Sequence, residues 1–184
     1  RVQSIPFLND DVKDFVNIVK LTKGLRSNIK KRLKFRLKQT LSINSEKIFS
    51  DLFGRRTIDT PTKHNTYYRS LINSKLVLMT YPTTSFSESM QLNIPTILVC
   101  KKETWQFEKS SLKMFNSLKK NKIAFENFVE AREHINNSWD KVDSWWNDKK
   151  VQDVRKKYLK NFFNVNANWY DEWLNYLKII KNSK

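Results

Sequence analysis

The residues best suited to chemistry lie in a hydroxyl-rich turn between two apolar runs. Thr83, Thr84 and Ser85 supply three side-chain hydroxyls, and Glu88 follows one helical turn after Thr84. If a helix begins here, the unpaired N–H groups of its first turn and its dipole favour an anion such as phosphate. A carboxylate cannot help to bind phosphate, but it can accept hydrogen bonds from the two hydroxyls of a ribose. The turn therefore predicts contacts to the phosphate and ribose of a nucleotide.

A purely local alternative accounts for the same residues. Thr84 or Ser85 could cap the helix, and Glu88, three residues after Ser85, would then complete a capping box. The spacing alone does not distinguish ligand binding from capping.

Two short apolar runs must position this turn. They cover residues 76–79 and 94–100, and helix-compatible sequence lies between the turn and the second run. Continuous apolar runs of this length are typical of buried parallel strands, which a crossover helix must join. We therefore expect strand, turn, helix and strand, with the turn at the carboxyl end of the first strand.

Apolar spacing and turn residues predict further elements on both sides of this unit. The expected helices cover residues 9–24, 45–53, 67–72 and 108–120, and the expected strands cover 30–38, 55–59 and 123–125. This alternation predicts an α/β fold with a Rossmann-like, doubly wound, mainly parallel sheet, whose ligands bind beyond the carboxyl ends of the strands. We assign residues 1–137 to this domain, which lacks an expected first strand, and residues 138–184 to a helical, Trp-rich extension that packs back on it.

The last third of the chain places aromatic residues at helical spacing. One face holds Val151, Val154, Tyr158, Leu159 and Phe162, and another holds Trp169, Trp173, Tyr176, Leu177 and Ile180. Aromatic residues at this spacing usually belong to a core, so we expect Trp169 and Trp173 to be buried against the domain or a partner. Interleaved Lys and Trp also suit a stacking platform for single-stranded nucleic acid, which is the alternative.

Five short motifs occur in the same order as in a poorly characterised bacterial family of surface-carbohydrate transferases, which the chain resembles. They are Thr80 to Glu88, Asn93 to Ile97, Trp145 with Trp146, Val151 to Arg155, and Trp169 with Trp173. The first motif is also similar to the donor-nucleotide site in the carboxyl-terminal half of GT-B-type transferases, among them peptidoglycan glycosyltransferases and CDP-glycerol glycerophosphotransferases. In those proteins a strand ending in a hydroxyl-rich loop leads to a helix with a ribose-binding Glu.

The resemblance implies a transferase of surface polysaccharide or glycan synthesis that uses a nucleotide sugar or a CDP-glycerol-like donor. It implies donor contacts from Thr80, Tyr81, Thr83, Thr84, Ser85, Phe86 and Glu88. Arg36 matches the Arg of a family pattern and could reach a donor phosphate, or it could face solvent at a sheet edge. The string at Trp105 to Glu108 departs from the family's W-E-L-R. The acceptor site and the general base are expected in a missing amino-terminal domain, so the catalytic residues stay unknown.

The formal net charge is +17, from 35 Lys and Arg against 18 Asp and Glu in 184 residues. Such an excess attracts anionic lipid, phosphorylated ligands or, least favoured here, nucleic acid. An AT-rich genome would also produce abundant Lys, Asn and Ile without any partner. The single Cys100 and the lack of any apolar run near the length of a membrane span predict a cytoplasmic protein. Peripheral contact with the anionic inner face of the plasma membrane is expected.

Neither His64 nor His134 has a Cys, His or carboxylate at ligand spacing, so we expect no metal and no cofactor beside the donor. A nucleophilic hydrolase is disfavoured because the G-x-S-x-G elbow is absent. Two other functions stay open, namely a basic, non-enzymatic nucleic-acid-binding module and a nucleotide-sugar epimerase on the same fold. The missing initiator Met and first strand predict that the sequence is a fragment.

Overall fold

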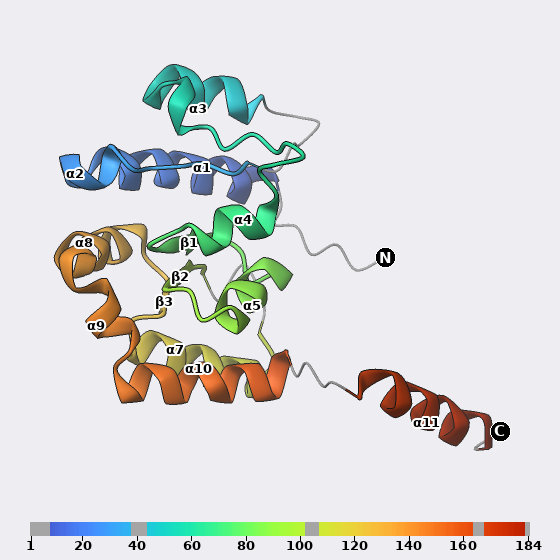
Figure 1. Cartoon of the computed structure of the whole chain (residues 1–184). Helices are drawn as coiled ribbons and strands as arrows, with labels where there is room; N and C mark the ends of the chain where they lie inside the picture. The colour runs from blue at the N-terminus through green and yellow to red at the C-terminus, as the bar shows by residue number, and fades with distance from the viewer. Residues whose placement is uncertain (1–7, 38–43, 102–106, 164–167, 183–184) are drawn as a thin grey trace.

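The computed structural model describes residues 8–37, 44–101, 107–163 and 168–182, and its elements form layers around a small sheet (Figure 1). Within these residues the sheet has three parallel strands in the order β1 (Val77–Met79), β2 (Thr96–Val99) and β3 (Ala124–Phe125). In the register of the sheet, Val77 pairs with Thr96 and Leu98 pairs with Ala124. The described chain is therefore an α/β protein with a parallel sheet, and most of its other residues are helical.

Helices cover both faces of the sheet. On one face lie α5 (Thr84–Gln91), which joins β1 to β2, α7 (Lys109–Lys120) and α10 (Lys149–Phe162). On the other face lie α1 (Leu8–Lys23) and α8 (Phe128–Ser138). The strand order does not reverse among the described strands, so the predicted α/β class is confirmed but the doubly wound, Rossmann-like arrangement is not.

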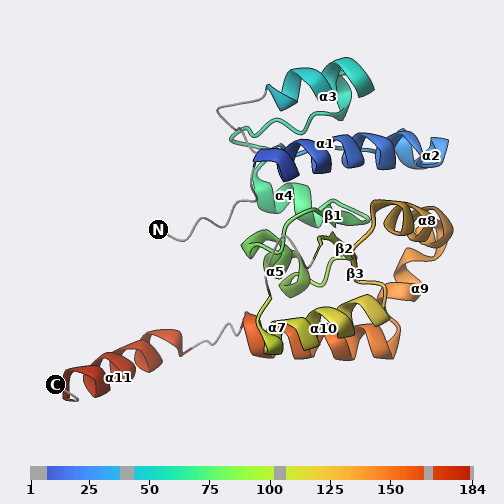
Figure 2. The same ribbon diagram turned by 180° about the vertical axis from the view of Figure 1, so that it is seen from behind.

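The central strand β2 is buried throughout and divides the core between these two layers. Ile97 and Val99 point toward α1 and α8, whereas Leu98 and the adjacent Cys100 point toward α5, α7 and α10. Successive side chains of a strand point to opposite faces, so a strand covered on both faces is apolar except where a buried polar group finds a partner. Ile97, Leu98 and Val99 are apolar, and the buried hydroxyl of Thr96 donates to the carbonyl of Ile94. The view from behind shows the same layers (Figure 2).

The remaining elements lie outside these layers. They are α2 (Ser27–Lys30), α3 (Ser45–Phe53), the 3-10 turns η1 (Arg55–Thr57) and η2 (Trp139–Lys141), α4 (Tyr67–Ile72), α9 (Val142–Trp146) and, after α10, α11 (Trp169–Asn182). The predicted helix 45–53 is confirmed as α3, and local chemistry accounts for its ends. The side chain of Asn44 accepts the N–H of Lys47, and Gly54 ends the helix with a φ of 90°, a conformation that favours glycine.

The predicted strands 30–38 and 55–59 are wrong in the part that the structure describes. Only Phe35 and Ile58 form an isolated parallel bridge, because the segment before Phe35 is a turn and residues 55–57 form η1. The alternation in this segment still distinguishes packed from exposed side chains, because the Phe35 ring packs against Phe49 and Phe53. A strand needs a partner of matching length, which neither segment finds here.

The predicted carboxyl-terminal helices are present as α10 and α11, and they differ in burial. Val151 is buried in the same core as α5 and α7, with Tyr158 packed against it, so α10 belongs to the layered body. Trp169 and Trp173 of α11 are 60% and 57% exposed, so the described part of the domain does not bury them, and their burial against a partner stays a prediction. A boundary at residue 137 stays a prediction.

Candidate functional site

The hydroxyl-rich turn lies where the sequence places it, between the carboxyl end of β1 and the first turn of α5. Thr83 is the N-cap residue, with an extended backbone and no hydrogen bond from its side chain to the helix. Its carbonyl accepts the N–H of Phe86 at 2.9 Å. Within the described part of the chain, the N–H groups of Thr84 and Ser85 have no protein acceptor. Two backbone donors and the hydroxyls of Thr83 and Thr84, both exposed, thus face the carboxyl edge of the sheet.

The capping-box alternative is wrong. Ser85 is the second residue of α5 and does not cap it, so Glu88 lies in the second turn rather than at the capping position. The Glu88 carboxylate instead accepts a hydrogen bond from the Tyr68 hydroxyl, with 3.2 Å between Tyr68 Oη and Glu88 Oε1. Glu88 lies one helical turn after Thr84, close to the unpaired N–H groups. Because it is also partly exposed, its carboxylate can accept further hydrogen bonds.

Helix α4 contributes Tyr67 and Tyr68, neither of which is among the predicted site residues. Tyr67 donates to the carbonyl of Ser85 at 3.4 Å, and burial raises its pKa. Tyr68 is exposed, and its hydrogen bond to Glu88 raises its pKa. Both phenols therefore stay protonated donors at neutral pH and line the edge of the site beside α5. In the sequence, the only sign of this role is that two adjacent tyrosines begin the predicted helix 67–72.

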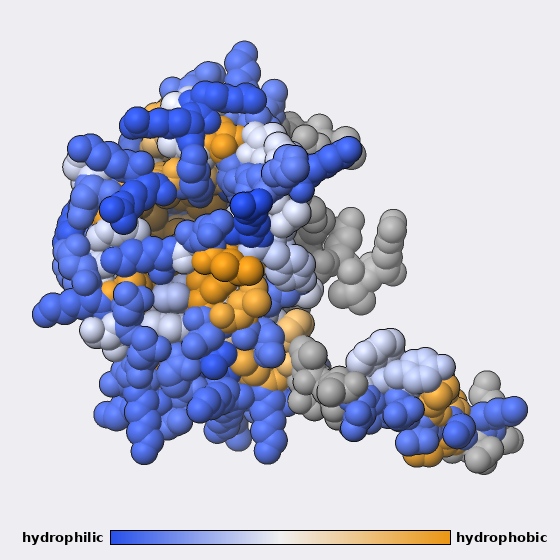
Figure 3. All heavy atoms as spheres, viewed as in Figure 1, coloured by the Kyte–Doolittle hydropathy of each residue, from blue (hydrophilic) through white to orange (hydrophobic). Residues whose placement is uncertain are grey.

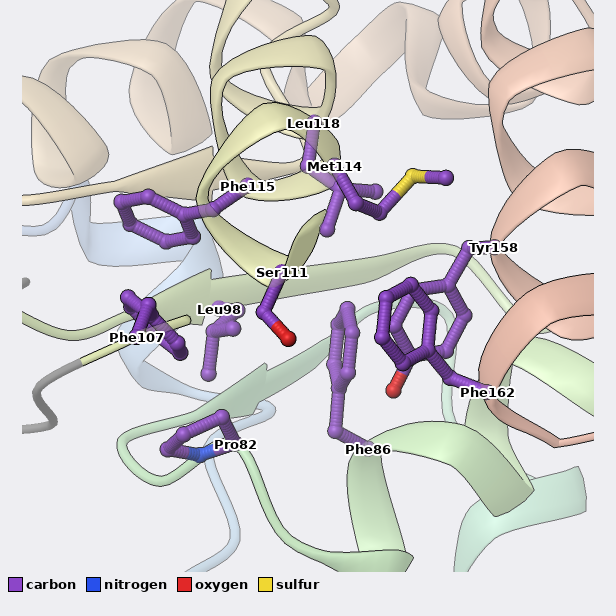
Figure 4. Close-up of a pocket in the computed structure, with 10 residues that line it drawn as sticks. All are labelled: Pro82, Phe86, Leu98, Phe107, Ser111, Met114, Phe115, Leu118, Tyr158 and Phe162. Atoms are coloured by element: carbon purple, nitrogen blue, oxygen red, sulfur yellow. The ribbon is translucent and has the colours of Figure 1, made fainter. Parts of the chain in front are cut away.

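Phe86 does not face the same space as the hydroxyls. It is only 1% exposed, and its ring packs edge-on against Tyr158 with 5.2 Å between centroids. Together with Pro82, these rings line a small apolar pocket of about 170 Å³ between the turn, α7 and α10 (Figure 4). This pocket is too small and too apolar for a nucleotide. The structure therefore places Phe86 in the core, and a donor contact from this residue stays a prediction.

The carboxyl end of α5 is held by residues from three of the motifs that carry the resemblance. Asn93, with a φ of 55°, accepts the indole N–H of Trp146 at 3.0 Å and the side-chain amide of Gln152 at 3.2 Å. Arg155 donates to Gln152 and to the carbonyl of Met90 at 2.6 Å. We call these five residues the α5 lock. It satisfies the carbonyl of Met90 in the last turn of α5 and holds this end of the helix against α9 and α10, a role that the motifs did not reveal.

Arg36 lies near the site, but its guanidinium already has partners. It pairs with Asp59 at 2.9 Å, donates to the Ser70 hydroxyl at 2.8 Å, and stacks over the Tyr67 ring at 5.9 Å. Burial alone would raise the pKa of Asp59, but hydrogen bonds from Ser70, Asn65 and Arg36 lower it by more, so the net pKa is lowered. The observed contacts make Arg36 a support for α4, and a contact with donor phosphate stays a prediction.

Replacing Asp59 with Asn is expected to flatten the acid dependence of stability. The folded-state pKa lies below the unfolded-state value, so the ionised carboxylate stabilises the fold above the unfolded-state value. This contribution is lost as the pH falls through the folded-state pKa. Below about pH 4, the free energy of unfolding should therefore fall more steeply for the wild type than for Asp59→Asn. Urea denaturation at a series of pH values measures both slopes. Asp153→Asn changes an exposed carboxylate and should keep the wild-type slope. Equal slopes for all three proteins would contradict the assignment.

Other predicted features of this edge have mixed outcomes. Residues 102–106, and with them Trp105 and Gln106, lie outside the described residues. Burial raises the pKa of Cys100 to about 12, so its thiol is an inert part of the core. No group of three His, Cys, Asp or Glu among the described residues could hold a metal ion.

The fold and the site together define the class of protein. The chain is a parallel α/β protein with a helix amino-terminus, hydroxyls and a carboxylate gathered beyond the end of a strand. Residues 1–177 match the model of the LIC12162 family transferases. Since this match covers nearly the whole sequence, the chain belongs to that transferase family. No curated protein and no solved structure matches the chain.

Proposed function

We propose that this transferase chain is the donor-binding half of a GT-B-type enzyme that moves a unit from a nucleotide-activated donor onto a surface glycan. The donor is a nucleotide sugar or a CDP-glycerol-like molecule. The observation that carries the proposal is the open amino-terminus of α5, where the N–H groups of Thr84 and Ser85 have no protein acceptor in the described part of the chain and Glu88 stands one turn away.

Each group has a specific task in this proposal. The N–H groups and hydroxyls of the turn hold the donor diphosphate and stabilise the negative charge that develops as it leaves. Glu88 accepts hydrogen bonds from the ribose, and Tyr68 keeps the carboxylate oriented toward the open side of α5. Thr80 and Tyr81, which lie just before the turn, add further contacts to the donor in this proposal. The general base that activates the acceptor belongs to another part of the enzyme, which also supplies the acceptor site.

A panel of nucleotides is expected to separate this function from its alternatives. A nucleoside diphosphate at about 100 times its dissociation constant should stabilise the fold by about 2.7 kcal/mol. For a chain of this size the melting temperature then rises by roughly 5 to 10 °C. One base should be preferred. If generic oligonucleotides stabilise the protein as well as any nucleotide, and salt abolishes both effects, the chain is a basic nucleic-acid-binding module. Product formation from a nucleotide sugar without an acceptor would indicate an epimerase.

A pair of variants tests the backbone donors directly. Thr84→Pro removes the N–H of the first residue of α5, where proline is well tolerated, and the extended backbone of Thr83 suits a following proline. We expect diphosphate binding to weaken by roughly tenfold, because one hydrogen bond to a charged group is lost, while the melting temperature is kept. Thr84→Ala removes the hydroxyl and keeps the N–H, so it separates the two donors. Unchanged binding by Thr84→Pro would exclude this N–H from the site.

A further inference from the structure

Helix α11 exposes an apolar face that nothing in the described chain covers. Its exposed fractions are 60% for Trp169, 57% for Trp173 and 58% for Tyr176, and Ile180 is 43% exposed. Figures 1 and 2 show the helix clear of the layered body from opposite sides. Six residues, 163–168, separate it from α10. An exposed apolar face of this kind is typical of a site that binds a partner or a membrane.

The side chains of α11 have the distribution of a helix that lies in a membrane interface. At helical spacing, one broad face carries both tryptophans with Tyr170, Tyr176, Leu174, Leu177 and Ile180, with Lys181 beside Tyr170 and Leu174 and with Glu172 at its other border. The opposite face carries Asp171, Asn175 and Lys178. Trp and Tyr prefer the level of the lipid head groups, and aliphatic side chains enter the acyl region just below it. Among the described residues no helix is long and apolar enough to cross a membrane, so α11 would lie along a surface.

The neighbouring layer of the body is strongly basic. The outer stripe of α7 carries Lys109, Lys113, Asn116 and Lys120, and that of α10 carries Lys149, Asp153, Lys156 and Lys160. All of these side chains are exposed, and Lys150 and Lys157 lie beside the second stripe. Figure 3 shows this lower surface of the body as hydrophilic, next to α11. Six lysines against one aspartate on the two stripes make a surface that attracts anions.

We propose that α11 inserts its Trp face into the interface of an anionic lipid bilayer while the lysines of α7 and α10 rest on the head groups. The two features act together, because stable peripheral binding needs an apolar anchor and a basic patch. Charge complementarity selects this partner. Other surfaces of the chain are basic too, but this layer contains α10, the helix that directly precedes α11 in the chain. The proposal does not depend on the identity of the donor.

Two other occupants fit the same observations less well. A stacking platform for nucleic acid needs aromatic rings within a basic groove, whereas α11 carries Asp171 and Glu172 against Lys178 and Lys181 and has no net charge. Its aliphatic residues would add nothing to base stacking. A second copy of this strongly basic chain would bring like charges together, which opposes association.

Vesicle binding by the whole chain tests the proposal. We expect the protein to co-sediment with vesicles of phosphatidylcholine that contain about a third phosphatidylglycerol, at least about tenfold more tightly than with phosphatidylcholine alone. Added salt should weaken this binding. Tryptophan emission should shift to shorter wavelength, and lipids brominated in the acyl chain should quench it. A protein that shows no preference for anionic vesicles would overturn the proposal.

Two double variants separate the anchor from the charge. Trp169→Ala with Trp173→Ala should weaken vesicle binding by about tenfold or more and abolish the emission shift. Lys156→Gln with Lys160→Gln should weaken binding by about fivefold per lysine. Lys20→Gln with Lys31→Gln makes the same change of charge on the opposite side of the sheet and should have little effect. Asn175→Ala, on the polar face of α11, should bind like the wild type.

Four outcomes would overturn the proposal in different ways. Wild-type binding by the double Trp variant would leave α11 without a role, and equal losses from the two Lys pairs would mean that only net charge matters. Protection of Trp169 and Trp173 from acrylamide without lipid, together with sedimentation that depends on protein concentration, would assign α11 to a second copy. Protection by an oligonucleotide and not by vesicles would assign it to nucleic acid.

Discussion

Replacing Glu88 with Gln is expected to weaken nucleotide binding by about one to two powers of ten. Gln keeps the shape of the side chain and part of its acceptor capacity, but it removes the charge-assisted component of the hydrogen bonds to ribose. That component is worth roughly 1.5 to 3 kcal/mol, and about 1.4 kcal/mol corresponds to a tenfold change in affinity. Isothermal titration of the preferred nucleotide measures the change. The position of Glu88 in the second turn of α5, away from any capping position, removes helix capping as an explanation for a loss.

A 2′-deoxyribonucleotide supplies the matched comparison, since it removes a ribose hydroxyl rather than the acceptor. The wild type should discriminate against the deoxy ligand, and Glu88→Ala should lose most of that discrimination. Tyr68→Phe removes the hydrogen bond that the carboxylate accepts within the protein at 3.2 Å and keeps the carboxylate itself. This variant should bind within about tenfold of the wild type, because an exposed hydrogen bond contributes only about 0.5 to 1.5 kcal/mol. Equal wild-type affinity for both ligands would remove Glu88 from the site.

Replacing Trp146 with Ala is expected to cause the largest loss of stability, about 3 to 5 kcal/mol in the free energy of unfolding. The side chain is 2% exposed and packs in the core with α5 and α10. Its removal leaves a cavity and takes the indole donor from the carbonyl of Asn93, 3.0 Å away, whereas Asn93 Oδ1 still accepts the side-chain amide of Gln152. Urea denaturation followed by circular dichroism measures the loss. Nucleotide binding should weaken as well, because the α5 lock holds the helix that carries the site.

Trp169→Ala is the matched control for this experiment. It deletes the same side chain at a position that is 60% exposed, so the free energy of unfolding should change by no more than about 0.5 kcal/mol. Trp146→Phe keeps most of the apolar volume and loses the indole N–H, and it should cost roughly 1 to 3 kcal/mol. If Trp146→Ala and Trp169→Ala destabilise the protein equally, α11 is packed against the domain and the assignment of the two tryptophans is wrong.

Local patterns in the sequence determined the central unit. The continuous apolar runs predicted β1 and β2, and the hydroxyl-rich turn was placed correctly before α5. These predictions succeed because burial on both faces of a strand and the start of a helix depend mainly on residues that are neighbours in the chain. The ends of α3 at Asn44 and Gly54 follow from the same kind of local chemistry.

Tertiary structure alone decided the features that depend on distant partners. Whether residues 30–38 form a strand depends on a partner strand of suitable length, which the alternation of side chains cannot report. The α5 lock joins Asn93 to Trp146 and Gln152 across 53 and 59 positions of sequence, so the motifs show no sign of their contact. Periodicity also gave α10 and α11 similar apolar faces, yet only α10 is covered. A hydrophobic period shows which side of a helix is apolar, and only the packing of the whole chain shows what lies against that side.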